Sequence, residues 1–136
     1  MPRQRNLFIS HSWTYTDAYQ KFCNLLDKTP RFAYRNYSVP KDDPIHNARN
    51  TAALYQAIKA QMVFCEVIII MAGKYATYSK WINNEIQIAK GDFNKPVLAV
   101  RPWAATQVSS VVRDNADMMV GWNSSTIVTA IRTLAP

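Results

Sequence analysis

The chain has 136 residues, and its sixteen lysines and arginines outnumber nine aspartates and glutamates, which gives a formal net charge of +7. This length suits one compact domain, so we expect residues 1–136 to form a single domain. A hydrophobic fraction of 49% with 18% charged residues excludes a disordered chain. The three glycines, Gly73, Gly91 and Gly121, stand far apart, which excludes a Walker loop and a GxGxxG dinucleotide turn.

The longest apolar stretch, residues 63–72, contains Glu66. A membrane span needs about 20 residues, so we expect this stretch to lie in the core and expect no membrane contact. The amino-terminal residues carry charge but no apolar signal region, which argues against export. Cys23 and Cys65 form no CxxC pair. We interpret them as reduced, packed thiols and expect a cytoplasmic protein.

The basic residues are spread along the chain, with no run of five or more. A positive balance can serve a nucleic acid, an anionic ligand or solubility alone. The absence of a basic run disfavours a dedicated nucleic-acid tail. A nucleic-acid-binding or nucleotide-binding domain therefore ranks third among the functions considered below.

Apolar runs and amphipathic stretches alternate along the chain, which predicts strands alternating with helices. In chain order we expect a strand at 7–9, a helix at 16–28, a strand at 32–37, a helix at 51–62, a strand at 67–71, a helix at 79–90, a strand at 96–100, a short helix or irregular crossover at 109–115, a strand at 118–122 and a last helix from Ser124 or Ser125.

The strands are expected to form a parallel sheet covered by helices on both faces, a three-layer α/β fold. Residues 67–71 are a continuous, mostly β-branched run, typical of a central strand buried on both faces. Polar and apolar side chains alternate in residues 32–37, as expected at a sheet edge. With right-handed crossovers, strand order 2-1-3-4-5 and a flavodoxin-like architecture follow. Residues 11–15 lack the Ser, Thr and Gly density of a phosphate cradle, which disfavours an FMN-binding flavodoxin.

In such a sheet, ligands bind beyond the carboxyl ends of the strands where the strand order reverses, here between the first and third strands. The head of the third helix lies beside this crevice. On that helix, Trp81 and Glu85 are four residues apart and share one face. This spacing also fits a solvated Glu85 that pairs with Lys80 or Lys90, so both interpretations remain open at this point.

Five segments carry a family resemblance, in this order: FISHSW, SVPKDDP, CEVIIIMAG, SKWINNEI and KPVLAVRPW. Together they resemble the TIR-like domains of bacterial anti-phage systems, and the TIR-like subunit of Thoeris defence most closely. The resemblance covers residues 6–134. It implies a TIR-like fold and cleavage of NAD at the nicotinamide–ribose bond, with Glu85 as the catalytic glutamate and Trp81 as the motif tryptophan.

The implied chemistry suits a carboxylate. Nicotinamide leaves NAD as a neutral molecule, so the ribose passes through an oxocarbenium-like state that a carboxylate can stabilise. Water as the acceptor gives ADP-ribose, and an acceptor within the same nucleotide gives a cyclic isomer, as the Thoeris resemblance implies. NAD is then the substrate, and no cofactor is expected.

Further residues at the strand ends are candidate substrate contacts. Ser10 can bind a diphosphate or ribose, or make loop hydrogen bonds. Asn36 and Asp43 stand at and after the end of the second strand, where related TIR domains bring a loop over the ligand. The candidate substrate-binding residues besides Trp81 are Phe8, Ser10, His11, Asn36, Asp43 and Ser79.

Asp42, Asp43 and His46 stand close together in the sequence, but adjacent aspartates in a proline-bounded loop are ordinary turn chemistry, so we expect no metal site. The alternative function is a non-catalytic interaction module, because many TIR domains act by assembling with one another. The expected partners are thus NAD or a related nucleotide, further copies of the chain, and a separate effector protein that responds to the product.

Overall fold

The computed structural model describes residues 4–10, 18–37, 51–71, 80–101 and 110–136. Strands and helices alternate throughout this part of the chain. In order, the elements are β1 (Gln4–Ile9), α1 (Ala18–Asp27), β2 (Ala33–Asn36), α2 (Thr51–Met62), β3 (Val67–Met71), α3 (Lys80–Ile86), the π-helical segment η3 (Gln87–Asp92), β4 (Val97–Val100), α4 (Ser110–Asn115), β5 (Met118–Val120) and α5 (Ser124–Leu134).

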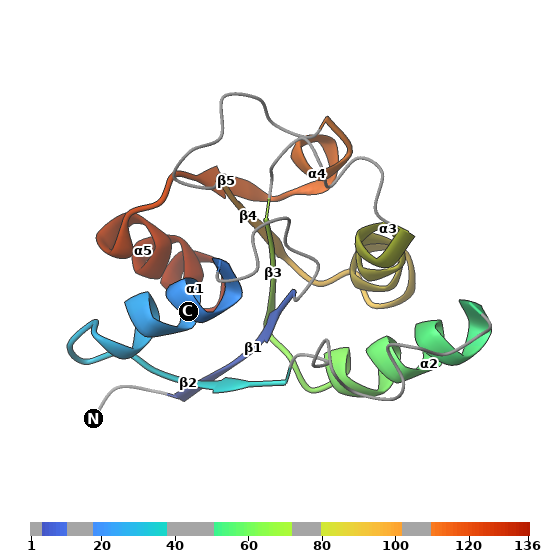
Figure 1. Cartoon of the computed structure of the whole chain (residues 1–136), viewed down its shortest axis with the longest axis horizontal. Helices are drawn as coiled ribbons and strands as arrows, with labels where there is room; N and C mark the ends of the chain where they lie inside the picture. The colour runs from blue at the N-terminus through green and yellow to red at the C-terminus, as the bar shows by residue number, and fades with distance from the viewer. Residues whose placement is uncertain (1–3, 11–17, 38–50, 72–79, 102–109) are drawn as a thin grey trace.

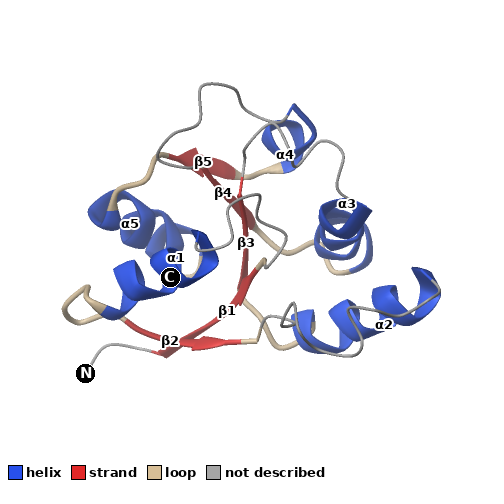
Figure 2. Cartoon of the chain, in the orientation of Figure 1, coloured by secondary structure: helices blue, strands red, loops and turns tan. Residues whose placement is uncertain are grey.

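The strands form one parallel sheet in the order β2-β1-β3-β4-β5. Helices α1 and α5 cover one face of this sheet, and α2, α3 and α4 cover the other (Figure 1). Coloured by secondary structure, the sheet is a twisted middle layer between two sets of helices (Figure 2). The predicted three-layer α/β fold and its strand order are therefore confirmed. The order reverses between β1 and β3, where the sequence places the site.

Two hydrophobic clusters, one on each face of the sheet, form the core. Alternation along the strands divides their side chains between the clusters, because successive residues of a strand point to opposite faces. In β1, Leu7 and Ile9 join the α1/α5 cluster, whereas Phe8 joins the α2/α3/α4 cluster. In β3, Ile69 joins the first cluster and Ile70 the second. The central strands are thus buried on both faces, as the continuous apolar run predicted.

The predicted third helix differs most from the observed one. The sequence predicts one helix over residues 79–90, whereas α3 ends at Ile86 and continues as η3 to Asp92. At its end, the Phe93 N–H donates to the Ile88 carbonyl, five residues back, at 3.0 Å. Ile88 and Ala89 are both fully buried in the α2/α3/α4 cluster, so tertiary packing favours the wider helical turn.

None of the helices in the described residues is long and apolar enough to cross a membrane.

Candidate functional site

Ser10 extends the sheet by one residue beyond β1. Its N–H donates to the Ile69 carbonyl of β3 at 3.0 Å, so the β1–β3 pairing continues past Ile9. Strand alternation directs the side chains of Phe8 and Ser10 to the same face, the one covered by α2, α3 and α4. The hydroxyl of Ser10 therefore stands at the carboxyl end of β1, beside the point where the strand order reverses.

Glu85 reaches the same place from α3. The Ser10 Oγ donates to the Glu85 Oε1 at 2.7 Å, and neither side chain has exposed surface. In the described part of the chain, these two are the polar side chains that are fully buried. A buried carboxylate costs free energy unless it is hydrogen-bonded, and a bond to a charged group recovers about 1.5–3 kcal/mol. The fold thus holds a carboxylate in its interior at the predicted crevice.

The burial of Glu85 contradicts one of the two interpretations of its helix position, the solvated one. The interpretation of Glu85 as a solvated partner of Lys90 is wrong, because Glu85 is buried and the Lys90 ammonium instead pairs with Asp117. Residues Ile82 and Ile86, three before and one after Glu85, are buried in the α2/α3/α4 cluster. Glu85 therefore lies on the sheet-facing side of α3 rather than on its outer side.

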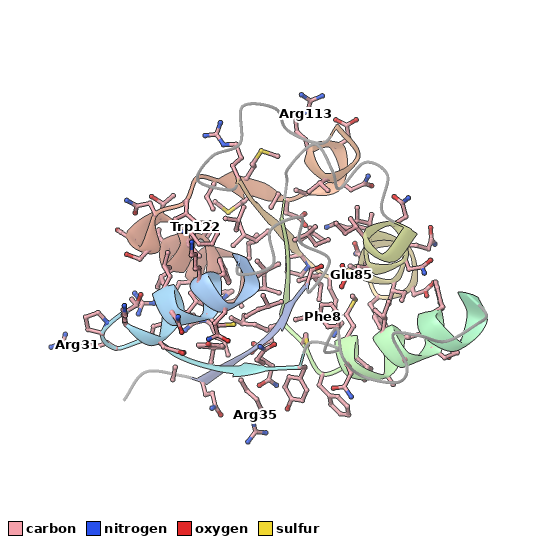
Figure 3. All side chains as sticks on the ribbon, viewed as in Figure 1. Phe8, Arg31, Arg35, Glu85, Arg113 and Trp122 are labelled. Atoms are coloured by element: carbon pink, nitrogen blue, oxygen red, sulfur yellow. The ribbon has the colours of Figure 1, made fainter. Side chains whose placement is uncertain are left out.

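Phe8 lies on the same side of the sheet as Glu85, between the sheet and helices α2 and α3 (Figure 3). Its ring is fully buried, which supports a packing role. It forms part of the apolar surroundings of the site, and a direct substrate contact stays a prediction.

Asn36 is at the end of β2, but its side chain lies on the opposite face of the sheet. Its Nδ2 lies 4.0 Å from the Sγ of Cys23 in α1. Glu85, in contrast, belongs to α3, which covers the other face of the sheet. Strand alternation explains the difference, because Asn36 shares the face of Tyr34, whose hydroxyl bonds Asp27 of α1 at 2.7 Å. The described residues thus bring Ser10 and Glu85 together, but not Asn36.

The other predicted site residues are not placed. His11, Asp43 and Ser79 lie outside the described residues, as do Asp42 and His46. The backbone of Trp81 belongs to the first turn of α3, four residues before Glu85, and its side chain is outside the description. Their roles stay predictions. No group of three metal-ligating side chains occurs within the described ranges.

Sequence reasoning missed Asn84, the neighbour of Glu85. Its Nδ2 atom is buried and has no hydrogen-bond partner among the described residues. Buried donors without partners are rare in native proteins and often occur where a protein binds a ligand or water. Nothing in the sequence separates Asn84 from Asn83, which is exposed on the same helix.

A hollow lies on the side of the sheet opposite Glu85, between α1 and α5. It has a volume of about 470 Å³, and its lining includes Lys28, Arg132 and the hydroxyl residue Ser125. The Arg132 side chain is held in place there, because its Nη2 donates to the Arg31 carbonyl at 3.0 Å. The sheet separates this hollow from Glu85, so the hollow is not part of the predicted site.

Comparison with known proteins agrees with the fold and with the family resemblance. The family model described as Thoeris protein ThsB, TIR-like domain, matches residues 8–107, which include Ser10 and Glu85. None of the curated proteins matches the chain. Among solved structures, the response regulator domain of Thermotoga maritima CheB is similar, with a TM-score of 0.58 and 8% identity over 97% of this chain and 96% of that one. At this identity, the likeness concerns the fold alone.

Proposed function

The chain belongs to the TIR-like domain family of Thoeris protein ThsB, and from this membership we propose that it is a NAD-processing enzyme of bacterial anti-phage defence. The proposed reaction breaks the nicotinamide–ribose bond. It yields nicotinamide and either ADP-ribose or a cyclic ADP-ribose isomer that serves as a signal to a separate effector protein.

The observation that carries the proposal is the buried carboxylate of Glu85 at the carboxyl edge of the sheet, where the strand order reverses. Ligands of open α/β folds bind at this edge. The carboxylate accepts a hydrogen bond from the neutral hydroxyl of Ser10. A carboxylate kept in a largely apolar interior is characteristic of catalytic sites.

In the proposed mechanism, the bond between the ribose C1′ and the nicotinamide nitrogen breaks, and its electron pair leaves with the nicotinamide. Glu85 hydrogen-bonds the ribose hydroxyls and stabilises the positive charge that develops on the ribose. Attack of water on C1′, with loss of a proton, gives ADP-ribose. Attack by a nucleophile of the same nucleotide gives the cyclic isomer. Trp81, His11, Asp43 and Ser79 are proposed substrate contacts.

Substrate access sets a condition on this mechanism. Glu85 has no exposed surface in this structure, so NAD reaches the carboxylate only when the residues that cover it move. When the site must open before NAD binds, the apparent affinity for NAD is the intrinsic affinity multiplied by the fraction of molecules that are open. We therefore expect weak basal turnover, and NAD conversion is to be measured at both low and high protein concentration.

The test follows NAD, nicotinamide and ADP-ribose isomers by liquid chromatography and mass spectrometry with purified protein. We expect conversion by the wild type and at least about a 100-fold loss in Glu85→Gln, which keeps the shape but removes the charge. Asn83→Ala is the matched control, because Asn83 is an exposed neighbour on the same helix. Turnover by a folded Glu85→Gln protein at the wild-type rate would falsify the proposed role of Glu85.

A surface feature favours the second candidate function, the non-catalytic interaction module. Phe64 is 59% exposed and Val63 is 49% exposed, and the Phe64 ring stacks on Tyr37 just after the edge strand β2, with ring centroids 5.6 Å apart. Exposed apolar side chains beside an edge strand are typical of interaction surfaces. NAD that stays intact at all concentrations, together with self-association that Phe64→Ser weakens, would favour this module over the enzyme.

A further inference from the structure

We propose that Ser10 is a positioning residue that orients the Glu85 carboxylate for catalysis. Its hydroxyl binds one carboxylate oxygen, Oε1, and so fixes the orientation in which the carboxylate meets the substrate. This inference rests on the proposed function, because it assigns Ser10 a role in the NAD-cleaving site. It replaces the interpretation of Ser10 as a diphosphate or ribose contact.

The first argument is that Ser10 is held by the sheet. Its N–H donates to the Ile69 carbonyl of the central strand β3 at 3.0 Å. The preceding residues Phe8 and Ile9 are paired with Ile68 and Ile69 in register and are fully buried. A single side-chain torsion, χ1, places the serine oxygen relative to the main chain. Because the main chain is fixed here, the oxygen has only a few staggered positions.

The second argument is that Glu85 needs such a partner. A glutamate side chain has three rotatable bonds, and fixing it in one geometry costs up to about 2 kcal/mol of rotamer entropy. The 2.7 Å bond from the Ser10 Oγ to the Oε1 fixes the carboxylate end, while α3 fixes the backbone. Catalytic groups work best when neighbouring side chains hold them within about 0.5 Å of the productive position.

The third argument concerns where the Ser10 hydroxyl points. Its proton is directed at the Glu85 Oε1, which accepts it at 2.7 Å. Ser10 therefore acts on the substrate through Glu85. A direct contact would instead direct the hydroxyl proton away from Glu85 and towards a substrate oxygen.

The test compares steady-state kinetics of Ser10→Ala, Ser10→Thr and the control Ser125→Ala, which changes an exposed serine of α5. We expect Ser10→Ala to lower kcat about 10- to 100-fold with KM within about twofold, since positioning acts on the reacting geometry rather than on binding. Ser10→Thr, which keeps the hydroxyl, restores most of kcat, and Ser125→Ala is neutral. In the Glu85→Gln background, Ser10→Ala causes no further loss. A raised KM with unchanged kcat overturns the inference, because it assigns Ser10 to substrate binding.

A second measurement separates this inference from the proposed function. Urea unfolding of the wild type, the two single variants Ser10→Ala and Glu85→Ala, each of which removes one partner of the bond, and the double variant forms a thermodynamic cycle. Each single substitution raises the equilibrium constant of unfolding by some factor. We expect the factor for the double variant to be at least about threefold smaller than the product of the two single factors, because both substitutions remove the same bond. Additive effects overturn the positioning role whether or not NAD is cleaved. A wild type without turnover but with this coupling overturns the proposed function and retains Ser10 as the group that orients Glu85.

Discussion

At the scale of single residues, the Asp117 carboxylate joins three parts of the chain. It pairs with the Lys90 ammonium of η3 and accepts the Val97 N–H of β4 at 2.7 Å, just before β5 begins. Burial raises the pKa of the Asp117 carboxyl, but the hydrogen bonds from Lys90 and Val97 and the Lys90 charge lower it by more. The pKa of Asp117 therefore lies below its ordinary value, and the carboxylate stabilises the folded state.

The sign of the pH dependence follows from this lowered pKa. The contribution of Asp117 is present above the unfolded-state pKa, about 4, and is lost as the pH falls through the folded-state value. Because the Asp117 side chain is 39% exposed, we expect Asp117→Asn to lower the free energy of unfolding by only about 0.5–1 kcal/mol at pH 7 and by less at pH 3.

Denaturant unfolding at the two pH values measures this difference. Asp114→Asn is the control, since Asp114 is exposed and pairs only with its neighbour Arg113 among the described residues. A destabilisation by Asp117→Asn that is equally large at pH 3 and pH 7 would contradict the assigned ionic role.

Cys65 provides a second prediction at this scale. Burial raises the pKa of its thiol to about 12, although the Lys95 charge acts in the opposite direction, and the side chain is 3% exposed. At pH 8, a thiol with this pKa is ionised about a thousandfold less than an ordinary cysteine, so alkylation slows by about that factor. Peptide mapping after timed exposure to iodoacetamide follows Cys65 separately from Cys23. Unfolded protein should label fast, and equally fast labelling of the folded protein would contradict the burial.

The sequence predicted where Ser10 and Glu85 lie in the fold, but not how their side chains meet. Glu85 and Ser10 were each identifiable, because the order reversal of the sheet fixes which strand end and helix head meet. Their mutual bond was not, because it depends on the rotation of α3 about its own axis. Asn36 ends β2 as predicted, but its side chain lies on the α1 side of the sheet, and the face that a residue takes is weakly specified in a four-residue strand.

At the scale of elements, the amino terminus of α5 gives a prediction. The sequence predicted that Ser124 or Ser125 begins this helix, and the helix does begin at Ser124, with Asn123 before it as the cap. Asn123 has extended φ and ψ of −149° and 124°, and its side chain accepts the Thr126 N–H at 3.1 Å. Replacing an asparagine cap by alanine typically costs about 1 kcal/mol, so Asn123→Ala should lower the free energy of unfolding by about this amount.

Chemical denaturation of Asn123→Ala beside Ser125→Ala measures this cap. Ser125 is an exposed residue inside the helix, so its replacement should change the free energy by less than about 0.5 kcal/mol. Equal effects of the two substitutions would show that the asparagine does not act as a cap.

Helix α3 shows which properties of an element the sequence does not carry. Its position, and the burial of Ile82, Ile86 and Ala89, followed from their spacing. The change to a π-helix did not, because bonding to the residue five positions back reflects how Ile88 packs in the second cluster. A β-carbon at Gly91 would come 2.3 Å from the Nε2 of Gln87, an exposed and flexible side chain that can move aside, so this contact does not require glycine.

At the scale of the whole molecule, the strand order was predictable because a few strong constraints act together. A continuous apolar run in residues 67–71 requires burial on both faces, and right-handed crossovers then leave few topologies. The residues at which strands begin and end were less predictable than the strand order. For example, β1 begins at Gln4, three residues before the predicted start, because polar Gln4 and Arg5 pair with Ala33 and Tyr34 of the edge strand β2.

The central strand β3 makes the two layers of the molecule depend on each other. Ile69 packs in the α1/α5 cluster and Ile70 in the α2/α3/α4 cluster, and both are fully buried. Replacing a buried isoleucine by alanine typically costs about 2–5 kcal/mol. We expect Ile69→Ala and Ile70→Ala to destabilise the protein by similar amounts in this range, because each removes a side chain from one face of the same backbone.

The two layers should also unfold together in both variants. Methyl signals of Ile127 and Ile131 report on the first cluster, and those of Ile58 and Ile88 report on the second, so urea titration followed by methyl NMR observes each layer separately. One shared midpoint is expected in the wild type and in each variant, since neither helix layer retains a buried face once the sheet is lost. Arg35→Ala, at an exposed position of the edge strand, is the control that should leave the midpoint unchanged. If Ile69→Ala lowered the midpoint of the first cluster alone, the layers would be independent, and β3 would not join them into one cooperative unit.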